Sequence, residues 1–183
     1  MQIDCGSCLL RPLITSDAES LARHADDAEV ARNLRDRFPH PYRLADAEWY
    51  IAHVASRPLQ TSFGIVVDDA AIGTISIMLG EDISRCAAEI GYWIGQPFWG
   101  RGIMTDALRA TTAYAFETFP LTRVFAVPFV STTRSVRVLE KAGYVLEGRM
   151  KQSAIKNGVV LDQWLYAAYR DRATPAAPIE TRS

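Results

Sequence analysis

The sequence predicts an α+β fold in which helices cover both faces of a mixed β-sheet. Two helical segments stand near the start, a strand-rich stretch follows, and strands alternate with helices from residue 87 onward. No internal repeat, long linker or shift in composition divides the chain, and 183 residues are enough for one core. We therefore expect a single three-layer domain, helix on sheet on helix, over residues 1–170.

The composition excludes several classes of partner. A hydrophobic fraction of 49% with 22% charged residues is typical of a soluble globular protein. The net charge of −1 argues against a broad nucleic-acid surface, which needs a clustered basic excess. No apolar run approaches the roughly 20 residues of a membrane span, and the N-terminus lacks a secretion signal pattern. We expect a cytoplasmic protein without nucleic-acid or membrane partners.

The three cysteines do not point to a metal or a disulfide framework. Cys5 and Cys8 match C-x-x-C, but a redox motif of this kind usually stands between a strand and a helix, and this one precedes the first strand. A structural zinc site needs two further ligands, and neither a second cysteine pair nor paired histidines follow. We expect reduced thiols and no metal.

The N-terminal part should contain one short strand and two helices. Residues 8–13 form the strand, and residues 15–17 offer N-cap side chains for a helix that continues to about Asn33. Two prolines hold residues 37–42 in an ordered loop. A second helix spans about 45–56, and its Trp49 should pack in the core.

The centre of the chain should form three consecutive strands. Residues 62–67 and 71–79 are rich in isoleucine and valine, and residues 68–70 between them carry a hairpin signal. A polar loop over residues 80–86 leads to a third strand at residues 87–94.

A glycine-bearing turn follows that strand and opens a long helix. Gly100, Arg101 and Gly102 stand at its mouth, and apolar residues recur every three or four positions as far as Phe119. The first N–H groups of a helix have no intrahelical partner, and the dipole adds to their attraction for an anion. This turn should hold a pyrophosphate.

The last third should add a strand, a helix and a hairpin. Residues 124–130 form a buried strand whose Pro128 interrupts pairing on one side. Residues 131–133 should cap a helix that ends at Ala142, with Gly143 in the C′ position.

Two strands, at residues 144–155 and 159–170, flank residues 156–158. Asn-Gly within that connection is a strong hairpin signal. Residues 171–183 show no periodicity and should form a flexible tail.

Two stretches carry a family resemblance. GYWIGQPFWGRGIMTDAL at residues 91–108, followed by STTRSVRVLEKAGY at residues 131–144, resembles the GNAT superfamily of acetyl-CoA-dependent N-acetyltransferases. Within it the chain is most similar to the ribosomal-protein N-terminal acetyltransferase branch, from about Leu9 to Arg170. The resemblance implies a mostly antiparallel sheet of about seven strands, splayed between the fourth and fifth, with about four helices. It also implies acetyl-CoA as co-substrate and a primary amine as acceptor.

The first family motif locates the expected cofactor site. Gly102 matches the pattern Q/R-x-x-G-x-G/A, whereas Trp99 replaces its first residue and Met104 its last small residue. Met104 should narrow the approach of the cofactor. The cofactor contacts that the resemblance implies are Tyr92, Trp93, Ile94, Gly100, Arg101, Gly102, Ile103, Met104, Thr105 and Thr132.

The second motif implies a proton donor for the leaving thiolate. Thr132 stands where an asparagine is usual, and Leu139 replaces the tyrosine that protonates the thiolate in many members. Ser135 stands at the alanine position, as in the ribosomal branch, where a serine is proposed to act instead. The alternative is a helix serine that bonds back to a carbonyl one turn earlier.

Deprotonation of the amine requires a base because alkyl amines titrate near ~10. Glu89 is our candidate, directly or through water, since it shares a strand face with Gly91 and Trp93. Its alternative role is a carboxylate paired with an arginine. His40 competes as base, or packs beside Tyr42. The acceptor site should include Phe38, His40 and Tyr42, and backbone N–H groups of residues 92–94 should stabilise the oxyanion.

Two functions of different class remain open. The first is acetyl transfer by direct attack of the amine in a ternary complex, since none of the cysteines falls in either motif. The second is an acyl-CoA-binding sensor or partner protein with little catalysis. A nucleotide enzyme is disfavoured because no G-K-S/T and no third glycine follow the turn. The acceptor, the acyl preference and a homodimeric state are left undecided.

Overall fold

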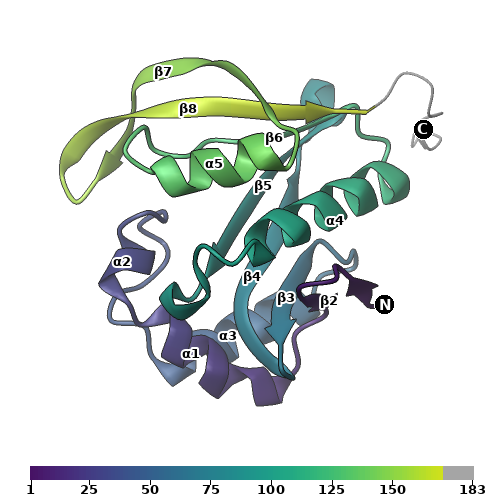
Figure 1. Cartoon of the computed structure of the whole chain (residues 1–183), viewed down its shortest axis with the longest axis vertical. Coiled ribbons are helices and arrows are strands. Elements are labelled where there is room, and N and C mark those ends of the chain that lie inside the picture. The colour runs from purple at the N-terminus through teal and green to yellow at the C-terminus, as the bar shows by residue number, and fades with distance from the viewer. Residues whose placement is uncertain (171–183) are drawn as a thin grey trace.

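The computed structural model describes residues 1–170; the tail expected at residues 171–183 lies outside them. One sheet runs in the order β1-β2-β3-β4-β5-β6-β8-β7, and every neighbouring pair is antiparallel except β5 with β6 (Figure 1). Its strands are β1 (Ile3–Asp4), β2 (Leu9–Arg11), β3 (Ser62–Val67), β4 (Ala70–Leu79), β5 (Ala87–Ile94), β6 (Arg123–Ala126), β7 (Val145–Lys156) and β8 (Val159–Tyr169). The predicted mixed, mostly antiparallel sheet is confirmed, with β1 as an additional eighth strand.

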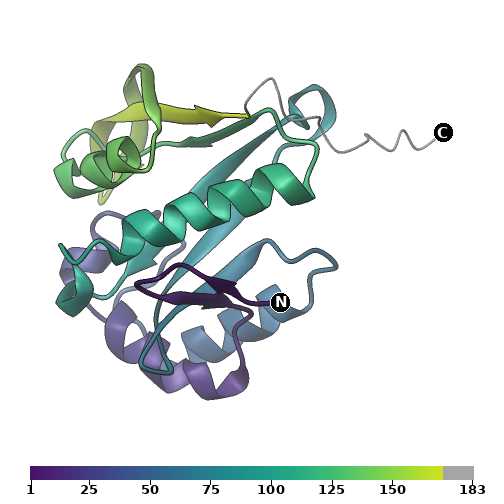
Figure 2. The same cartoon turned by 45° about the vertical axis from the view of Figure 1, so that its right-hand side comes forward.

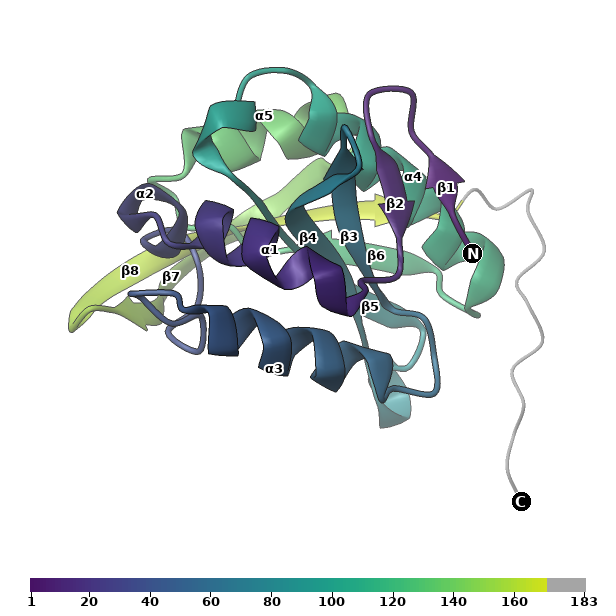
Figure 3. The same ribbon diagram turned by 90° about the horizontal axis from the view of Figure 1, so that it is seen from below.

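Helices cover both faces of this sheet. They are α1 (Ala18–Ala25), α2 (Ala28–Ala31), α3 (Leu44–Ala55), α4 (Ile103–Thr118) and α5 (Thr133–Lys141). In Figure 3, α1 and α3 lie on one side of the strands and α4 and α5 on the other. α1 packs on α3 and β4, whereas α4 packs on α5 and β4. The predicted three-layer α+β fold is therefore confirmed.

Each helical layer has its own apolar core. Under α4 and α5 the fully buried side chains include Phe63, Ile75, Ile77, Leu108 and Leu139. Under α1 and α3 a second cluster forms around Leu21, Ala25, Ala47, Ile51 and Val66. Residues of β4 and β5 belong to both clusters or pack against them. Because packed cores are rigid, these central strands hold the segments that follow them in fixed positions.

The single first helix expected as far as Asn33 is wrong. It divides into α1 and α2 because Asp27 has an extended backbone (φ −142°, ψ 123°) and its carboxylate accepts a hydrogen bond from the Glu29 N–H at 2.7 Å. An aspartate thus caps a new helix where the apolar pattern predicted continuation. The break turns the chain toward the loop that follows α2.

The strand expected at residues 124–130 is also too long, since β6 ends at Ala126. Pro128 has no N–H to donate, and its carbonyl instead accepts a bond from the Trp164 N–H at 2.9 Å. Phe129 makes only an isolated bridge with Gln163. The predicted interruption at Pro128 is confirmed, and it releases the chain toward α5.

Local turn chemistry follows the sequence closely. Asn157 and Gly158 both have positive φ (51° and 77°), which confirms the tight β7–β8 hairpin. Gly143 has φ 90°, and the Tyr144 N–H donates to the Leu139 carbonyl at 3.0 Å, as expected after a helix C-terminus.

The prediction that Trp49 packs in the core was wrong: 65% of the residue is exposed, and its ring stacks on that of His53 with centres 4.9 Å apart.

No helix within residues 1–170 is long and apolar enough to cross a lipid bilayer.

Candidate active site

The candidate site begins where the central sheet splays. β5 pairs with β6 only through Ala87, Ala88 and Glu89, whereas it pairs with β4 from Ala88 to Ile94. Because these strands are the fourth and fifth of the seven that the sequence predicted, the expected point of splaying is confirmed. Beyond Glu89, β5 keeps one edge without a strand partner, which we call the open edge (residues 90–94).

The register decides which backbone groups face the open edge. The Gly95 N–H donates to the Ile72 carbonyl at 2.9 Å, and bonded residues alternate along an antiparallel ladder. Ile90, Tyr92 and Ile94 therefore direct their N–H and C=O groups away from β4. Trp93 pairs with Thr74 and directs its own groups toward β4, which argues against the expected backbone contact from Trp93 to the cofactor.

The glycine turn stands at the far end of the open edge. Gly100 and Gly102 have φ of 77° and 85°, a left-handed conformation that favours glycine, and the space on their Cβ sides is open. α4 begins at Ile103, with Gly102 as its N-cap rather than as its first residue. The Gly102 carbonyl accepts the N–H groups of Thr105 and Asp106. The N–H groups of Ile103 and Met104, which precede these two, have no partner within the helix.

The side chains of this turn divide between solvent and core. Arg101 is exposed, and its guanidinium lies 5.4 Å from the centre of the Phe98 ring. Met104 is 7% exposed and belongs to the core beneath α4, as does Ile103. The Met104 side chain therefore does not narrow the approach to the turn as expected, and both residues can contact a ligand only through their backbone.

Trp99 connects the turn to both β5 and α5. Its indole N–H donates to the Ile94 carbonyl at 2.8 Å and so occupies one acceptor at the end of the open edge. The Arg134 guanidinium lies over its ring at 4.7 Å. The departure from the family motif at Trp99 thus has a structural role that the sequence did not reveal.

Ser135 faces the open edge from α5, on the opposite side of the splay. Its hydroxyl lies 2.8 Å from the Tyr92 hydroxyl, and either oxygen can donate. Removal of the phenol from water raises the pKa of Tyr92 well above its ordinary value, and the hydrogen bond with Ser135 opposes this shift only in part. Tyr92 therefore keeps its proton at neutral pH. The back-bonded serine considered for Ser135 is not what the structure contains.

Thr132 also differs from its expected role as a helix cap. It occupies the N-cap position of α5 without a capping hydrogen bond from its side chain. Its hydroxyl instead donates to the Asn33 side-chain oxygen at 3.2 Å. This contact joins the start of α5 to the α2–α3 loop (residues 32–43), which lies on the other face of the sheet.

Glu89 marks the vertex of the splay, since it is the last residue of β5 that pairs with β6. Its carboxylate forms an ion pair with Arg35 of the α2–α3 loop, and its side chain is 20% exposed. The arginine-paired state, one of the two alternatives for Glu89, is therefore present in this structure. The partner itself was not identifiable from the sequence because the two residues are 54 positions apart.

The α2–α3 loop covers the face of β5 that carries Glu89. Phe38 packs between Tyr42 and Trp93, with ring centres 4.9 and 5.5 Å apart. Tyr42 is buried in the core under α1 and α3, which places it behind Phe38 rather than at the surface. The His40 ring lies 3.7 Å from the Asp26 carboxylate. Of the expected acceptor residues, only Phe38 contacts the same face as Glu89.

A pocket of about 290 Å³ adjoins Arg35. The β7–β8 hairpin reaches toward the α2 end of the molecule (Figure 1), and Lys156 near its tip bonds to Asp36 at 2.9 Å. The loop and the hairpin line this pocket with both polar and apolar groups. The lining residues are Arg35, Asp36, Val127, Phe129, Ser153, Ala154, Ile155, Lys156 and Gln163. An extended chain or a small amine could reach the Arg35 side of the site from here.

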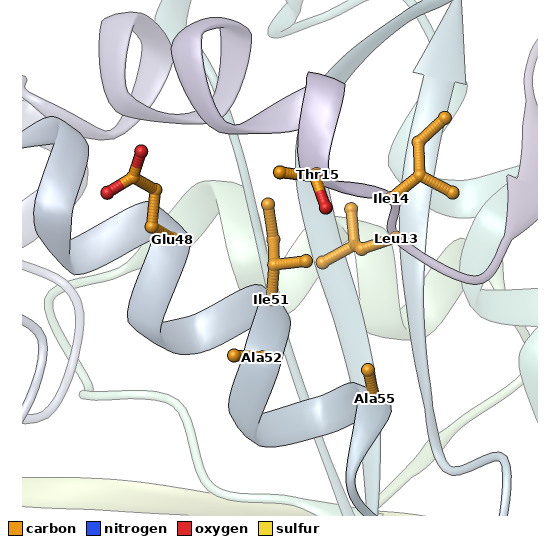
Figure 4. A pocket seen from close by; sticks show the side chains of 7 residues that line it. All are labelled: Leu13, Ile14, Thr15, Glu48, Ile51, Ala52 and Ala55. Atoms are coloured by element: carbon orange, nitrogen blue, oxygen red, sulfur yellow. The ribbon is translucent and has the colours of Figure 1, made fainter.

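A second pocket, of about 340 Å³, lies between α3 and the segment that joins β2 to α1 (Figure 4). Leu13, Ile51 and the small side chains of Ala52 and Ala55 make it mainly apolar, with Glu48 at one end. It shares no lining residue with the splayed site. Among residues 1–170, no cluster of His, Cys, Asp and Glu is suited to hold a metal ion.

Comparison with known proteins agrees with this geometry. A family model described as an acetyltransferase (GNAT) domain matches residues 8–145, more than half of the chain. YdaF of Bacillus subtilis, whose name assigns it provisionally to the ribosomal N-acetyltransferases, is 36% identical over 57% of this chain and 56% of its own length. The ribosomal-protein-serine acetyltransferase of Escherichia coli is 34% identical over 60% of each chain.

These alignments mean that the chain spans little more than half the length of those two relatives. Among solved structures, Mycobacterium smegmatis RimJ in complex with CoA-disulfide superposes with a TM-score of 0.80. It is 24% identical, and the match covers 94% of this chain and 86% of that one. At this identity the likeness establishes the shared fold.

Proposed function

Because this chain belongs to the GNAT acetyltransferase family, we propose that it is an acetyl-CoA-dependent N-acetyltransferase acting on a primary amine. The observation that carries the proposal is the open edge of β5, which leads from the vertex at Glu89 to the glycine turn at α4. An amide-bearing arm can bond along such an edge while its pyrophosphate meets the helix N-terminus. Acetyl-CoA combines both features in one molecule.

Arg101 is the charged group best placed for the phosphates. The backbone N–H groups of the turn, at Gly102 and Ile103, supply the remaining donors, since helix N-termini bind anions. Arg101→Ala should weaken acetyl-CoA binding in calorimetry, whereas the exposed Arg85, which precedes β5 and bonds to Asp82, provides a matched control as Arg85→Ala. Equal affinity in both variants would place the phosphates elsewhere.

The proposed reaction is direct attack on the thioester. The neutral amine attacks the carbonyl carbon, and the N–H groups of Tyr92 and Ile94 stabilise the tetrahedral oxyanion. When the C–S bond breaks, the thiolate receives the Ser135 proton, and the Ser135 oxygen is reprotonated in turn from solvent along its hydrogen bond with the Tyr92 hydroxyl, while Glu89 later releases the amine proton to solvent. The amine proton passes to Glu89, directly or through water. Acetyl amide and CoA thiol are the balanced products.

The two catalytic groups act from opposite faces of β5. Glu89 and Tyr92 occupy positions of opposite parity on the strand, so their side chains point to different faces. The amine should therefore enter from the side of the α2–α3 loop, and the thiol should leave toward α5. This arrangement keeps the base from neutralising the acid and suits a ternary complex.

We propose a protein N-terminal α-amine as the first acceptor to test, with small amines next. The support is the name of the Escherichia coli relative, a ribosomal-protein-serine acetyltransferase, together with the pocket between the loop and the β7–β8 hairpin. The protein should be incubated with acetyl-CoA and a panel of peptides and small amines, with thiol release and product mass as readouts. We expect turnover of peptides that have a free N-terminus and no turnover of the same peptides with a blocked N-terminus.

One observation favours the alternative of a CoA-binding protein with little catalysis. The ion pair with Arg35 engages the carboxylate that should accept the amine proton, so the carboxylate is not free to accept it in this structure. Tight acetyl-CoA binding in calorimetry without turnover on any member of the panel would establish that alternative. Turnover of even one amine class would exclude it.

A further inference from the structure

The turn between β1 and β2 brings two cysteines into opposition. The register pairs Ile3 with Leu10 and Asp4 with Leu9, which places Cys5 opposite Cys8. The Cys5 N–H donates to the Cys8 carbonyl at 2.9 Å, and Gly6 (φ 80°) allows the two-residue turn. Directly opposed residues share a face, with Cβ atoms about 5.5 Å apart in a hydrogen-bonded pair such as this one, so the ~3.5–4.5 Å of a disulfide is reached when the two strands are drawn together at the turn.

The two thiols differ in a way that suits a nucleophile and a resolving partner. Cys5 is half-buried, whereas Cys8 is buried. The hydrogen bond from the Cys8 thiol lowers the pKa of Cys5, against the opposing effects of its partial burial and of the Asp106 and Asp4 carboxylates. The same hydrogen bond and burial raise the pKa of Cys8. Cys5 is thus the thiol that ionises first.

This turn is also attached to the helix that carries the glycine turn. The Ser7 hydroxyl, between the two cysteines, donates to the Asp106 carboxylate at 2.7 Å. Asp106 lies in the first turn of α4, and its N–H donates to the Gly102 carbonyl at 3.2 Å. Figure 2 shows the β1–β2 hairpin lying alongside α4. A change at the cysteines can therefore reach Gly102 through two hydrogen bonds.

We propose that Cys5 and Cys8 form a reversible disulfide that alters the position of the turn against α4. The Cys5 thiolate attacks one sulfur of a low-molecular-weight disulfide such as oxidised glutathione and displaces one glutathione thiolate. Cys8 gives its proton to solvent, attacks the Cys5 sulfur of the mixed disulfide and releases the second glutathione. Two protein thiols are oxidised while one glutathione disulfide is reduced to two thiols.

Closure of the disulfide should loosen the contact with α4, because drawing the Cβ atoms together shifts Ser7 from Asp106. The consequence for acetyl-CoA rests on the proposed function. Loss of one hydrogen bond to a carboxylate corresponds to a roughly tenfold or greater loss of affinity if it is fully transmitted. The oxidised protein should therefore bind acetyl-CoA less tightly than the reduced protein.

The disulfide itself is tested by thiol mapping of the full chain in a Cys86→Ser background, which removes the remaining, exposed thiol. After treatment with oxidised glutathione, mass spectrometry should find Cys5 and Cys8 protected from iodoacetamide, with the mass of two hydrogens lost. Dithiothreitol should restore both thiols. Stable glutathione adducts on both residues, or two alkylated residues, would overturn the proposal.

The coupling is tested separately by calorimetry with acetyl-CoA on the reduced and oxidised forms. Ser7→Ala in the reduced protein should reproduce the weaker binding, because it removes the same contact with Asp106. Equal affinities in the reduced and oxidised forms overturn the coupling. If the reduced protein does not bind acetyl-CoA at all, the proposed function fails, whereas the thiol map still decides the disulfide.

Discussion

Replacement of Ser135 by alanine provides the sharpest test of the proposed chemistry. The Ser135 hydroxyl is the polar group that α5 directs at the open edge, 2.8 Å from the Tyr92 hydroxyl. If it protonates the departing thiolate, its loss should lower kcat by about 100-fold or more, the usual contribution of a general acid. The KM for acetyl-CoA should change little, because no phosphate contact is removed.

Stability must be separated from catalysis in this test. Ser135→Ala leaves the Tyr92 hydroxyl without its partner, which costs about 1–3 kcal/mol for a buried polar group. Thr112 and Tyr144 supply a comparable pair next to this one, since their hydroxyl oxygens lie 2.7 Å apart and burial likewise raises the pKa of Tyr144, with a smaller contribution from Tyr92. Thr112→Val removes the equivalent hydroxyl at nearly constant shape.

Both variants should therefore lose similar stability in urea unfolding, but only Ser135→Ala should lose turnover. The assay is thiol release with the best acceptor of the panel, at saturating acetyl-CoA and at a temperature where both variants are folded. Tyr92→Phe is the companion variant. A loss of kcat much smaller than that of Ser135→Ala would identify Tyr92 as a positioning residue. The assignment would be refuted if Ser135→Ala kept the wild-type kcat, or if Ser135→Ala and Thr112→Val lost kcat equally.

Three further predictions concern the base, the turn and pH. Glu89→Gln should lower kcat about 100-fold, whereas Arg35→Met should leave kcat unchanged or raise it, because it frees the carboxylate; a loss in both variants would make the ion pair structural. Gly102→Ala, at φ 85°, should lose about 1–2 kcal/mol in urea unfolding and raise the KM for acetyl-CoA about tenfold; an unchanged KM would remove Gly102 from the site. Burial, followed by the charge of Arg23, lowers the pKa of His24. The unfolded state therefore binds a proton at His24 before the folded state does, and stability should be lost as pH falls below ~6.5. The free energies of unfolding at pH 5 and pH 7.5 should differ less in His24→Asn than in the wild type.

The sequence predicted the layers and most turns because these depend on local patterns. Alternating and helical apolar periods define the faces that pack, and Asn157-Gly158 and Gly143 define backbone geometry within a few residues. The failures have equally local causes. Asp27 competed for the backbone N–H of Glu29 and began a new helix inside an amphipathic pattern that continued past it.

The candidate site was only half predictable, because its contacts join distant segments. The motif stretches located Gly102 and Ser135, yet neither the Trp99–Arg134 contact nor the partner of Ser135 follows from spacing. Tyr92 carried one available signal: a lone hydroxyl on an otherwise apolar strand face has to find a hydrogen-bond partner when buried. The sequence does not indicate which residue supplies it.

The ion pair between Arg35 and Glu89 could not be predicted from the sequence, because the two residues are 54 positions apart. This ion pair connects the α2–α3 loop to the vertex of the splay, and the same loop holds Lys156 of the hairpin through Asp36. An acceptor in the adjoining pocket can contact Arg35, since Arg35 lines that pocket. If the acceptor offers Arg35 another hydrogen-bond acceptor, such as a peptide carbonyl, Arg35 can leave Glu89 as the amine arrives. The base would then be released only when a substrate that carries such a group is bound, which favours peptides over simple alkyl amines.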